Sequence, residues 1–234
     1  MSRNIGRVSP KVDRNSGHFP CGVTGVILAG GRSSRMGSNK ALLPYRGERF
    51  IEAIHRQMHE LFDEVLLVTN TPEQYSFLSC RKVADIFQDA GALAGLHAGL
   101  HHSNTAHIFA VACDMPYLNP ALIGKIASLR DRADVVIPHG ANGWEPLHAL
   151  YRKECLAPME AALTEGRRRI VSFFPEVLVC QLSREAVAEL DPGFESFQNI
   201  NTPSDYFQLR DTDGASRGMT ICQAGSGGKS VCNA

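Results

Sequence analysis

The chain has 234 residues, which is enough for one α/β domain with a sizeable hydrophobic core and hardly enough for two. Apolar residues make up 44% of it and charged residues 21%, the proportions of an ordinary globular protein. Because 24 basic residues balance 24 acidic ones, nucleic-acid binding driven by bulk electrostatics is excluded, and a phosphate ligand has to be held by a local site.

The seven cysteines indicate a reducing compartment. Their number is odd, they are scattered, and they form no C-x-x-C pair, so neither a disulfide framework nor a zinc site is predicted from them. The sequence also lacks the hydrophobic segment of a signal peptide and any apolar run long enough to span a membrane. We therefore expect a cytoplasmic protein that does not associate with a membrane.

Residues 1–22 are rich in polar residues, proline and glycine without apolar periodicity, and we expect a disordered leader there. The folded part opens with a predicted strand over 23–29, which reads as buried on both faces and ends in two glycines. Two cations, Arg35 and Lys40, follow. Glycine lets backbone N–H groups approach phosphate oxygens and cations neutralise their charge, so we interpret this stretch as a cradle for nucleotide phosphates.

The cradle spans 24–44 and has the sequence TGVILAGGRSSRMGSNKALLP. Its glycine spacing matches neither the P-loop nor the dinucleotide fingerprint G-x-G-x-x-G. The pattern L-A-G-G-x-S-x-R-M-G-x-x-K-A-L instead resembles the signature of the molybdenum cofactor guanylyltransferases. The alternative is a glycine-rich turn between a strand and a helix, with its cations in solvent.

A predicted parallel sheet continues from the cradle. Apolar residues recur at helical spacing over 50–62, and strands are predicted at 65–69 and 82–84. Strands that alternate with helical segments favour parallel pairing through right-handed crossovers, and ligands bind beyond the carboxyl ends of such strands. We expect Asn70 and Asp85, which follow the two strands, to converge there with the cradle glycines.

A glycine-rich stretch, GALAGLHAGL at 91–100, follows Asp85. A helix is predicted to begin near Ala92, and the glycine before it allows close approach of a ring or sugar. The alternative is that these glycines only fit the helix against the sheet. The stretch is similar to the G-P-L-A-G segment of the guanylyltransferases, with Ala92 in place of the usual proline.

The largely apolar residues 107–112 predict a central buried strand that delivers Asp114 to the carboxyl edge of the sheet. A carboxylate there needs a cation, and Mg²⁺ shared with substrate phosphates meets that need, because it prefers one or two carboxylates with phosphate and water oxygens. The alternative is a carboxylate that caps the following turn. C-D-x-P is also the place where the guanylyltransferases carry their metal-binding aspartate.

A further helix and a hairpin are predicted next. The Asn-Pro pair at 119–120 is a helix start, because Asn caps helices and Pro is favoured in their first turn. Strands predicted at 134–138 and 147–151 flank a hairpin-like loop. Trp144 and Glu145 in this loop are candidates to line an acceptor pocket, and the alternative for the tryptophan is an exposed aromatic without a partner.

Polar residues near the end of the domain are candidates for the acceptor. A short helix predicted over 158–165 precedes three adjacent arginines, which are ordinarily a solvated face. A similar G-x-R-R segment occurs in the guanylyltransferases, so Arg168 or Arg169 is expected to hold an acceptor phosphate. The segment N-x-N-T-P, another family match, places Asn199 and Asn201 on one face of an extended segment, with local turn capping as the alternative.

The resemblance covers 22–210 and rests on four separated motifs in the family order. It implies a single-domain Rossmann-like nucleotidyltransferase fold over 23–210, with a mostly parallel central sheet and helices on both faces. Beyond 210 the composition turns to glycine, serine, alanine and threonine, and we expect a disordered tail over 211–234. The resemblance further implies transfer of GMP from GTP to the phosphate of molybdenum-loaded molybdopterin, with Mg²⁺ as cofactor and pyrophosphate as by-product. GTP and molybdopterin are the implied substrates, molybdoenzyme-maturation proteins are further partners, and we expect a monomer or weak homo-oligomer.

The resemblance also assigns roles to single residues. The expected catalytic residues are Arg35, Lys40 and Asp114, and Asp114 is the expected metal ligand. The expected GTP-binding residues are Leu28, Ala29, Gly30, Gly31, Lys40, Asn70, Asp85, Gly91 and Asp114. The expected acceptor-binding residues are Arg168, Arg169, Asn199 and Asn201.

Two alternatives remain open. One is an enzyme with another acceptor, such as a cobinamide phosphate guanylyltransferase or a cytidylyltransferase, although L-A-G-G in place of L-A-A-G favours GTP over CTP. The other is a non-catalytic GTP-binding subunit that delivers the cofactor to a partner. Retention of both cradle cations and of Asp114 argues against a mere carrier. The departures from the family pattern that favour it lie at Ser38, Asn39, Ala92 and Glu145.

Overall fold

The computed structural model describes most of the predicted domain, and all of the described residues belong to one unit that ends at Ile200. The described residues are 22–30, 39–45 and 47–200, without the side chain of Lys40. Gly31, Arg35 and Asn201 lie outside them, as do nearly all of the expected leader, residues 201–210 and the expected tail.

Apolar runs of the sequence form a central sheet. Its strands are β1 (Val23–Leu28), β4 (Val65–Val68), β5 (Arg81–Val83), β6 (His107–Ala112), β7 (Val135–Gly140), β8 (Gly143–Trp144), β9 (His148–Arg152) and β10 (Val179–Leu182). The order is β10-β7-β9-β6-β1-β4-β5, and β8 pairs with β7. Along this path every pairing is parallel except the two made by β9, which runs antiparallel to β6 and β7. A separate small hairpin consists of β2 (Pro44–Tyr45) and β3 (Glu48–Arg49).

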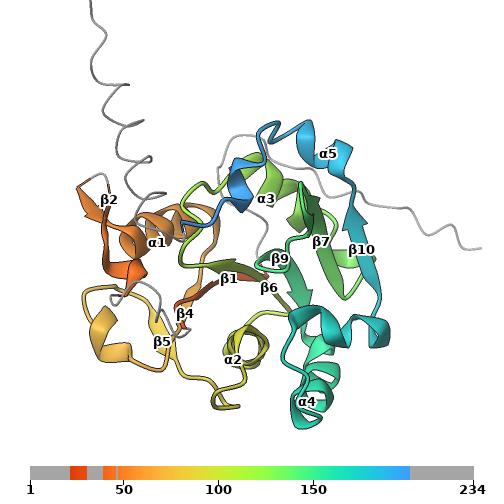
Figure 1. Cartoon of the computed structure of the whole chain (residues 1–234), viewed down its shortest axis with the longest axis horizontal. Coiled ribbons are helices and arrows are strands. Elements are labelled where there is room, and N and C mark those ends of the chain that lie inside the picture. Colours follow the sequence, from red (N-terminus) through yellow and green to blue (C-terminus); the bar gives the residue numbers. More distant parts are fainter. Residues whose placement is uncertain (1–21, 31–38, 46, 201–234) are drawn as a thin grey trace, which may run out of the picture. The chain divides into compact units, whose positions relative to one another are not determined.

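Helices cover both faces of the sheet (Figure 1). The α-helices are α1 (Phe50–Leu61), α2 (Ala92–His102), α3 (Pro120–Ala127), α4 (Leu156–Thr164) and α5 (Arg184–Ala188). Helices α1, α3 and α5 pack with Ile27 on one face, and α2 and α4 pack with Val26 and Leu28 on the other, because successive residues of β1 point to opposite sides. Within the described ranges, no helix has the length and apolarity that crossing a membrane requires.

Local signals in the sequence account for several element boundaries. Oδ1 of Asn119 accepts hydrogen bonds from the N–H groups of Ala121 (2.9 Å) and Leu122 (3.2 Å), which caps α3 as predicted. Gly166 follows α4 with a φ of 76°, in the left-handed region that glycine favours. Strand β10 and helix α5 were not predicted, because β10 has only four residues, lies at the sheet edge and is largely not buried.

Two glycines of α2 face the sheet, and one of them lets the helix approach it closely. A Cβ atom at Gly99 would lie 2.6 Å from Cγ1 of Val26, which is too close for any side chain without movement of β1. A Cβ atom at Gly95 would lie 3.5 Å from Cδ2 of Leu28, an ordinary contact. The packing interpretation of the glycine-rich stretch is therefore confirmed at Gly99, whereas packing does not require glycine at position 95.

Candidate active site

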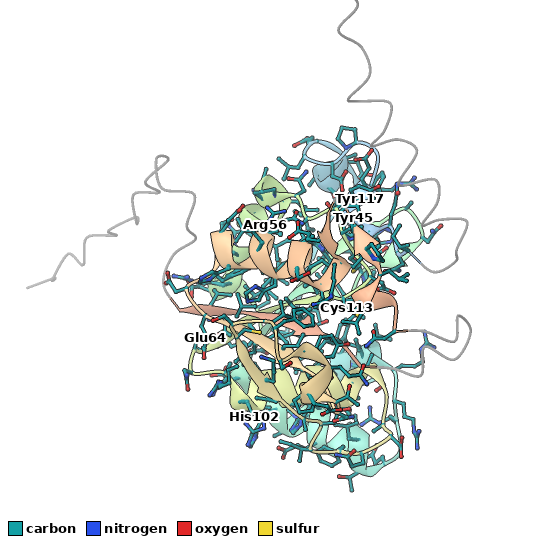
Figure 2. The ribbon with its side chains drawn as sticks, turned by 90° about the vertical axis from the view of Figure 1, so that its left-hand side faces the viewer. Tyr45, Arg56, Glu64, His102, Cys113 and Tyr117 are labelled. Carbon is teal, nitrogen blue, oxygen red and sulfur yellow. The ribbon has the colours of Figure 1, made fainter. Side chains whose placement is uncertain are left out.

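The carboxyl ends of the central parallel strands lie side by side. Strand β1 pairs in register with β4 and with β6, so the three strands end together. Beyond the last pair, the N–H of Cys113 donates to the carbonyl of Leu28 over 3.1 Å, which ties the segment after β6 to the end of β1. Figure 2 shows Cys113 at the end of the sheet opposite to Glu64, the residue before β4. Asp114 therefore lies near Gly30, the first of the two cradle glycines that follow β1.

Asn70 and Asp85 form a reciprocal hydrogen-bonded pair at the same edge. Nδ2 of Asn70 donates to Oδ2 of Asp85 over 2.9 Å, and the backbone N–H of Asp85 donates to Oδ1 of Asn70 over 2.9 Å. Burial raises the pKa of the Asp85 carboxyl, and the hydrogen bond from Asn70 opposes this shift. The expected convergence of these two residues is thus observed, with one carboxylate oxygen held by the amide.

The start of α2 borders this pair. Gly91 is its N-cap, and its φ of 74° is a conformation that glycine adopts without strain. The helix begins at Ala92, so the missing family proline does not displace the helix start. A Cβ atom at Gly91 or at Gly30 would meet no described atom within 4 Å, so the backbone at both positions is open to a ligand. Gly95, a residue that the sequence did not single out for the site, lies where its Cβ would be 3.6 Å from Oδ1 of Asp85.

Asp114 is partly buried in the turn after β6. Its backbone carbonyl accepts a hydrogen bond of 3.0 Å from the N–H of Ile200. This contact brings the exposed Asn199 next to the segment that carries the expected metal ligand. The C-D-x-P motif that contains Asp114 and the start of the N-x-N-T-P motif at Asn199 therefore lie next to each other. Asn201 lies outside the described residues.

The three adjacent arginines have different surroundings. Arg167 forms ion pairs with Glu165 (Nε to Oε2, 2.8 Å) and Glu176 (Nη2 to Oε1, 3.1 Å). Nη1 of Arg168 donates to the backbone carbonyl of Asp89, in the loop between Asp85 and α2, over 2.6 Å. Arg169 is exposed, and within the described ranges no hydrogen bond or ion pair engages its side chain. Arg167 is thus used for local structure, and the other two guanidinium groups present donors to solvent.

Asn39, which departs from the family pattern, anchors the far end of the cradle. Its Nδ2 donates to Oε1 of Gln74 and to the hydroxyl oxygen of Tyr75, both over 2.9 Å, and its Oδ1 accepts from the N–H of Ala41 over 3.2 Å. An aspartate has no N–H to donate to Gln74. The asparagine therefore fixes the chain directly before Lys40, whose own backbone begins the 3₁₀ turn Lys40–Leu42.

The hairpin between β7 and β9 carries two ionisable groups whose burial the sequence did not reveal. Burial raises the pKa of Glu145 to about 7. His148 is fully buried, packs edge-on against the rings of Phe109 and Phe197 at centroid distances of 5.2 Å and 5.3 Å, and burial lowers its pKa to about 4. The sequence shows only that a histidine begins an apolar strand. Its burial among aromatic rings, which keeps it neutral near pH 7, becomes visible only in the structure.

Trp144 is not an isolated surface aromatic. Its Nε1 donates to Oε1 of Gln181 over 2.8 Å, and its ring lies 5.4 Å from that of Phe174. The alternative of an exposed tryptophan without a partner is therefore wrong. These contacts join the hairpin to β10 and to the 3₁₀ helix Ile170–Glu176.

A cavity of about 570 Å³ opens on the α1 face and contains none of the expected site residues. It begins at Pro116, two residues after Asp114, and extends to α1 and to the segment before Ile200. Its lining includes Tyr45, Arg56, Gln57, Tyr117 and Glu195. The candidate site is therefore the one at the strand ends, which lies outside this cavity.

Comparisons with known proteins identify the family of the chain. The profile of the MobA-like NTP transferase domain matches residues 25–180. The chain belongs to this family. The predicted resemblance is thereby confirmed, together with the α/β fold class and the assignment as a nucleotidyltransferase enzyme.

Relatives and solved structures within the MobA-like family extend the match over most of the chain. A molybdenum cofactor guanylyltransferase of Desulfosudis oleivorans is 38% identical over 182 residues, 77% of this chain and 90% of that protein. A probable molybdenum cofactor guanylyltransferase of Pelotomaculum thermopropionicum is 37% identical, over 80% of this chain and 91% of that protein. The crystal structure of molybdopterin-guanine dinucleotide biosynthesis protein A from Archaeoglobus fulgidus has a TM-score of 0.73 at 25% identity, and covers 82% of this chain and 99% of that one.

Proposed function

We propose that the protein transfers GMP from GTP to the phosphate of molybdopterin, which gives the guanine dinucleotide form of the molybdenum cofactor and pyrophosphate. Its relatives named molybdenum cofactor guanylyltransferase support this activity. The observation that carries the proposal is the junction of β1 and β6, where the hydrogen bond from Cys113 to Leu28 sets Asp114 beside the glycine-rich cradle. A carboxylate next to a backbone cradle suits a nucleoside triphosphate with a divalent cation.

The donor set at this junction fits Mg²⁺. Asp114 supplies a hard carboxylate oxygen at the partly buried end of a strand whose six residues are all buried, and phosphate and water oxygens would complete the shell. One oxygen of the other carboxylate, Asp85, is already held by Asn70, so Asp85 is assigned to the nucleoside. Bound at Asp114, Mg²⁺ would offset negative charge on the phosphates.

The nucleoside is held on the β1–β4–β5 side of the edge. Asp85, oriented by Asn70, accepts hydrogen bonds from N–H groups of the base, and the backbone of residues 28–31 contacts the nucleotide. Gly91 leaves room for the ring or sugar at the start of α2. These contacts fix GTP before the reaction, and fixed geometry is a main source of rate in phosphoryl chemistry.

No nucleophilic side chain is required. A phosphate oxygen of the acceptor attacks the α-phosphorus of GTP, the bond from that phosphorus to the bridging oxygen breaks, and pyrophosphate leaves with the electron pair. Lys40 and Arg35 stabilise the charge on the departing pyrophosphate. The anchoring of Asn39 supports this role of Lys40, because it fixes the chain immediately before the cation.

Arg168, Arg169, Asn199 and Asn201 hold the acceptor. The guanidinium groups bind its phosphate, for which their forked donors are suited, and the amides contact the pterin. The hydrogen bond from Arg168 to Asp89 supports this role, because it sets that arginine on the loop beside the GTP edge.

Pyrophosphate release tests the proposal. The untagged protein is incubated with Mg²⁺ and either GTP or CTP, with and without molybdenum-loaded molybdopterin. Release that requires both GTP and the pterin is expected. Faster release with CTP would point to a cytidylyltransferase, and tight GTP binding without release under any of these conditions would point to a delivery subunit or another acceptor.

A further inference from the structure

Three potential metal ligands meet between α2 and α4. His97 and His101 lie one helical turn apart on α2, and Glu160 lies on α4. One ligand atom from each residue lies within 4.8 Å of the others. Gly95 and Gly99 turn the opposite side of α2 toward the strands, so the histidine face is the one that α4 covers.

His97 is already held in place. Its side chain is 1% exposed, and its Nε2 lies 3.1 Å from Oε1 of Glu160. The ring of Phe87 packs against it at a centroid distance of 5.1 Å and an interplanar angle of 82°. Because packing fixes the imidazole, little conformational entropy is lost when a ligand binds it.

We propose that His97, His101 and Glu160 form a binding site for a borderline transition-metal ion, with Zn²⁺ as the best fit, that bridges α2 and α4. Two imidazole nitrogens and one carboxylate oxygen, with water in the fourth position, are a common zinc ligand set. Imidazole is a poor ligand for Mg²⁺, so this site differs in chemistry from the one assigned to Asp114.

The distances require only side-chain movement. In a tetrahedral zinc site with bonds of about 2.0–2.1 Å, neighbouring ligand atoms are about 3.3 Å apart. His97 and Glu160 are already near this separation at 3.1 Å. His101 and Glu160 are exposed, so their rotamers can close the remaining gap without a shift of either helix.

The site lies away from the GTP edge. Helix α2 begins beside Asp85 and runs toward the opposite edge, and Figure 2 shows its last residue, His102, on the side of Glu64 and away from Cys113. An ion there joins the helix that starts at the GTP edge to the helix that precedes the arginine segment. It stabilises the folded protein by mass action and takes no part in the transfer.

The surroundings of His97 set the expected affinity. Its Nδ1 is buried and has no hydrogen-bond partner among the described residues. Zinc-bound histidines usually donate from the second nitrogen to an acceptor, and loss of that contact lowers affinity by about 10–100-fold. We expect a dissociation constant on the order of micromolar and an ion that a chelator removes.

A second histidine pair provides a matched control. His55 and His59 on α1 have the same spacing, and their rings lie 6.0 Å apart. Burial lowers the pKa of His55, and the charges of His59 and Lys82 lower it further. In the part of the chain that the structure describes, no carboxylate completes a cluster with this pair.

The experiment uses the untagged full-length protein after treatment with EDTA. Zn²⁺ binding is measured by calorimetry, Co²⁺ binding by its visible absorption, and the melting temperature with and without Zn²⁺. The variants His101→Ala and Glu160→Ala change exposed residues, so the fold is retained, which circular dichroism checks. His59→Ala, His102→Ala and Asp114→Asn are the controls.

One equivalent of Zn²⁺ is expected, with a rise in melting temperature. His101→Ala and Glu160→Ala should each weaken binding at least about tenfold and remove the rise, and the three controls should leave both unchanged. The proposal is overturned if no saturable binding occurs up to about 1 mM, well above the expected range. It is equally overturned if His101→Ala and Glu160→Ala bind as the parent does, or if Asp114→Asn abolishes binding.

Discussion

Arg168 reaches back to Asp89, where its Nη1 donates a hydrogen bond to the backbone carbonyl. Asp89 has a φ of 55°, in the left-handed region that few residues other than glycine adopt. The contact joins the segment after α4 to the loop that leads from Asp85 into α2. The segment that we propose to hold the acceptor and the loop beside the proposed nucleotide site are therefore held together.

Arg167 and Arg169 should have different functions, one in stability and one in binding the acceptor. Arg169→Ala should raise the KM for molybdopterin at least about tenfold and leave the KM for GTP unchanged, because a phosphate loses a charged donor. Arg167→Ala should lower the melting temperature and leave both KM values unchanged, because its ion pairs with Glu165 and Glu176 are structural. Steady-state kinetics and thermal denaturation measure the difference. The reverse pattern would show that the roles are exchanged.

Asp114→Asn should lower kcat by at least about 100-fold, since charge stabilisation at a phosphoryl group contributes several kcal/mol. GTP binding, measured by calorimetry, should weaken far less, because the base and cradle contacts remain. Asp131→Asn removes a carboxylate whose side chain is 85% exposed, and should change neither quantity. Equal losses of turnover and GTP affinity in Asp114→Asn would contradict the metal role.

GTP binding should weaken on acidification at a higher pH than an ordinary aspartate would produce. Burial raises the pKa of Asp85 above 3.8, so its negative charge is lost as the pH falls through that raised value. Asn70→Ala removes the hydrogen bond that lowers this pKa and should move the midpoint to still higher pH. Asp85→Asn reports the titration of GTP itself, and an identical pH profile for this variant and the parent would refute the role of Asp85.

Glu145→Gln should stabilise the protein above pH 7 and not below pH 4.5. The pKa of Glu145 rises from 4.5 in the unfolded chain to about 7 on folding, so the folded state holds its proton more tightly, and stability falls as the pH rises between these values. Glutamine cannot ionise, and at pH 8 we expect a gain of about 1–2 kcal/mol, reduced by partial solvent exposure. Urea denaturation at pH 4 and pH 8 measures it, with exposed Glu189→Gln as control. A gain that is the same at both pH values would exclude burial of charge as its cause.

Gly99→Ala and Gly95→Ala should differ although they change the same helix. Alanine is favoured over glycine in a helix by about 1 kcal/mol, and Gly95 has room for the methyl group, so this variant should be as stable as the parent or slightly more stable. The methyl group at Gly99 would press on Val26, and overpacking costs about 1–3 kcal/mol. Urea denaturation compares them. Equal stability of the two variants would mean that β1 moves freely to make room.

The central fold was predictable because its signals are local. The apolar runs of β1, β4 and β6 and the Asn-Pro start of α3 each mark an element by themselves. The meeting of Asn70 with Asp85 followed from the rule that parallel strands expose their carboxyl ends at one edge. These predictions needed no knowledge of how distant segments pack.

The features that the sequence did not predict depend on contacts between segments that are distant in the chain. The half-buried β10 becomes a strand only because β7 offers it an edge, and Arg168 meets a carbonyl 79 positions earlier. Burial raises the pKa of Glu145, whose side chain lies against Gly140 of β7, a glycine that Phe197 also borders. The clustering of His97 with Glu160 likewise requires α2 and α4 to be in contact, so the histidine spacing alone did not reveal it.

Because β9 runs antiparallel to its neighbours, the connection that leads into it can vary independently of the parallel part of the sheet. Because β9 starts at the edge where β6 and β7 end, the connection between β7 and β9 is a hairpin that stays at that edge, with no helix crossing a face of the sheet. A change of length within residues 141–147 therefore leaves the register of β1, β4 and β5 in place and affects only β8 and the contacts of Trp144 with Gln181 and Phe174. With the nucleotide site proposed at β1, β4 and β5, the hairpin beside β7 and β9 is the part of the edge that can change while the proposed nucleotide contacts stay.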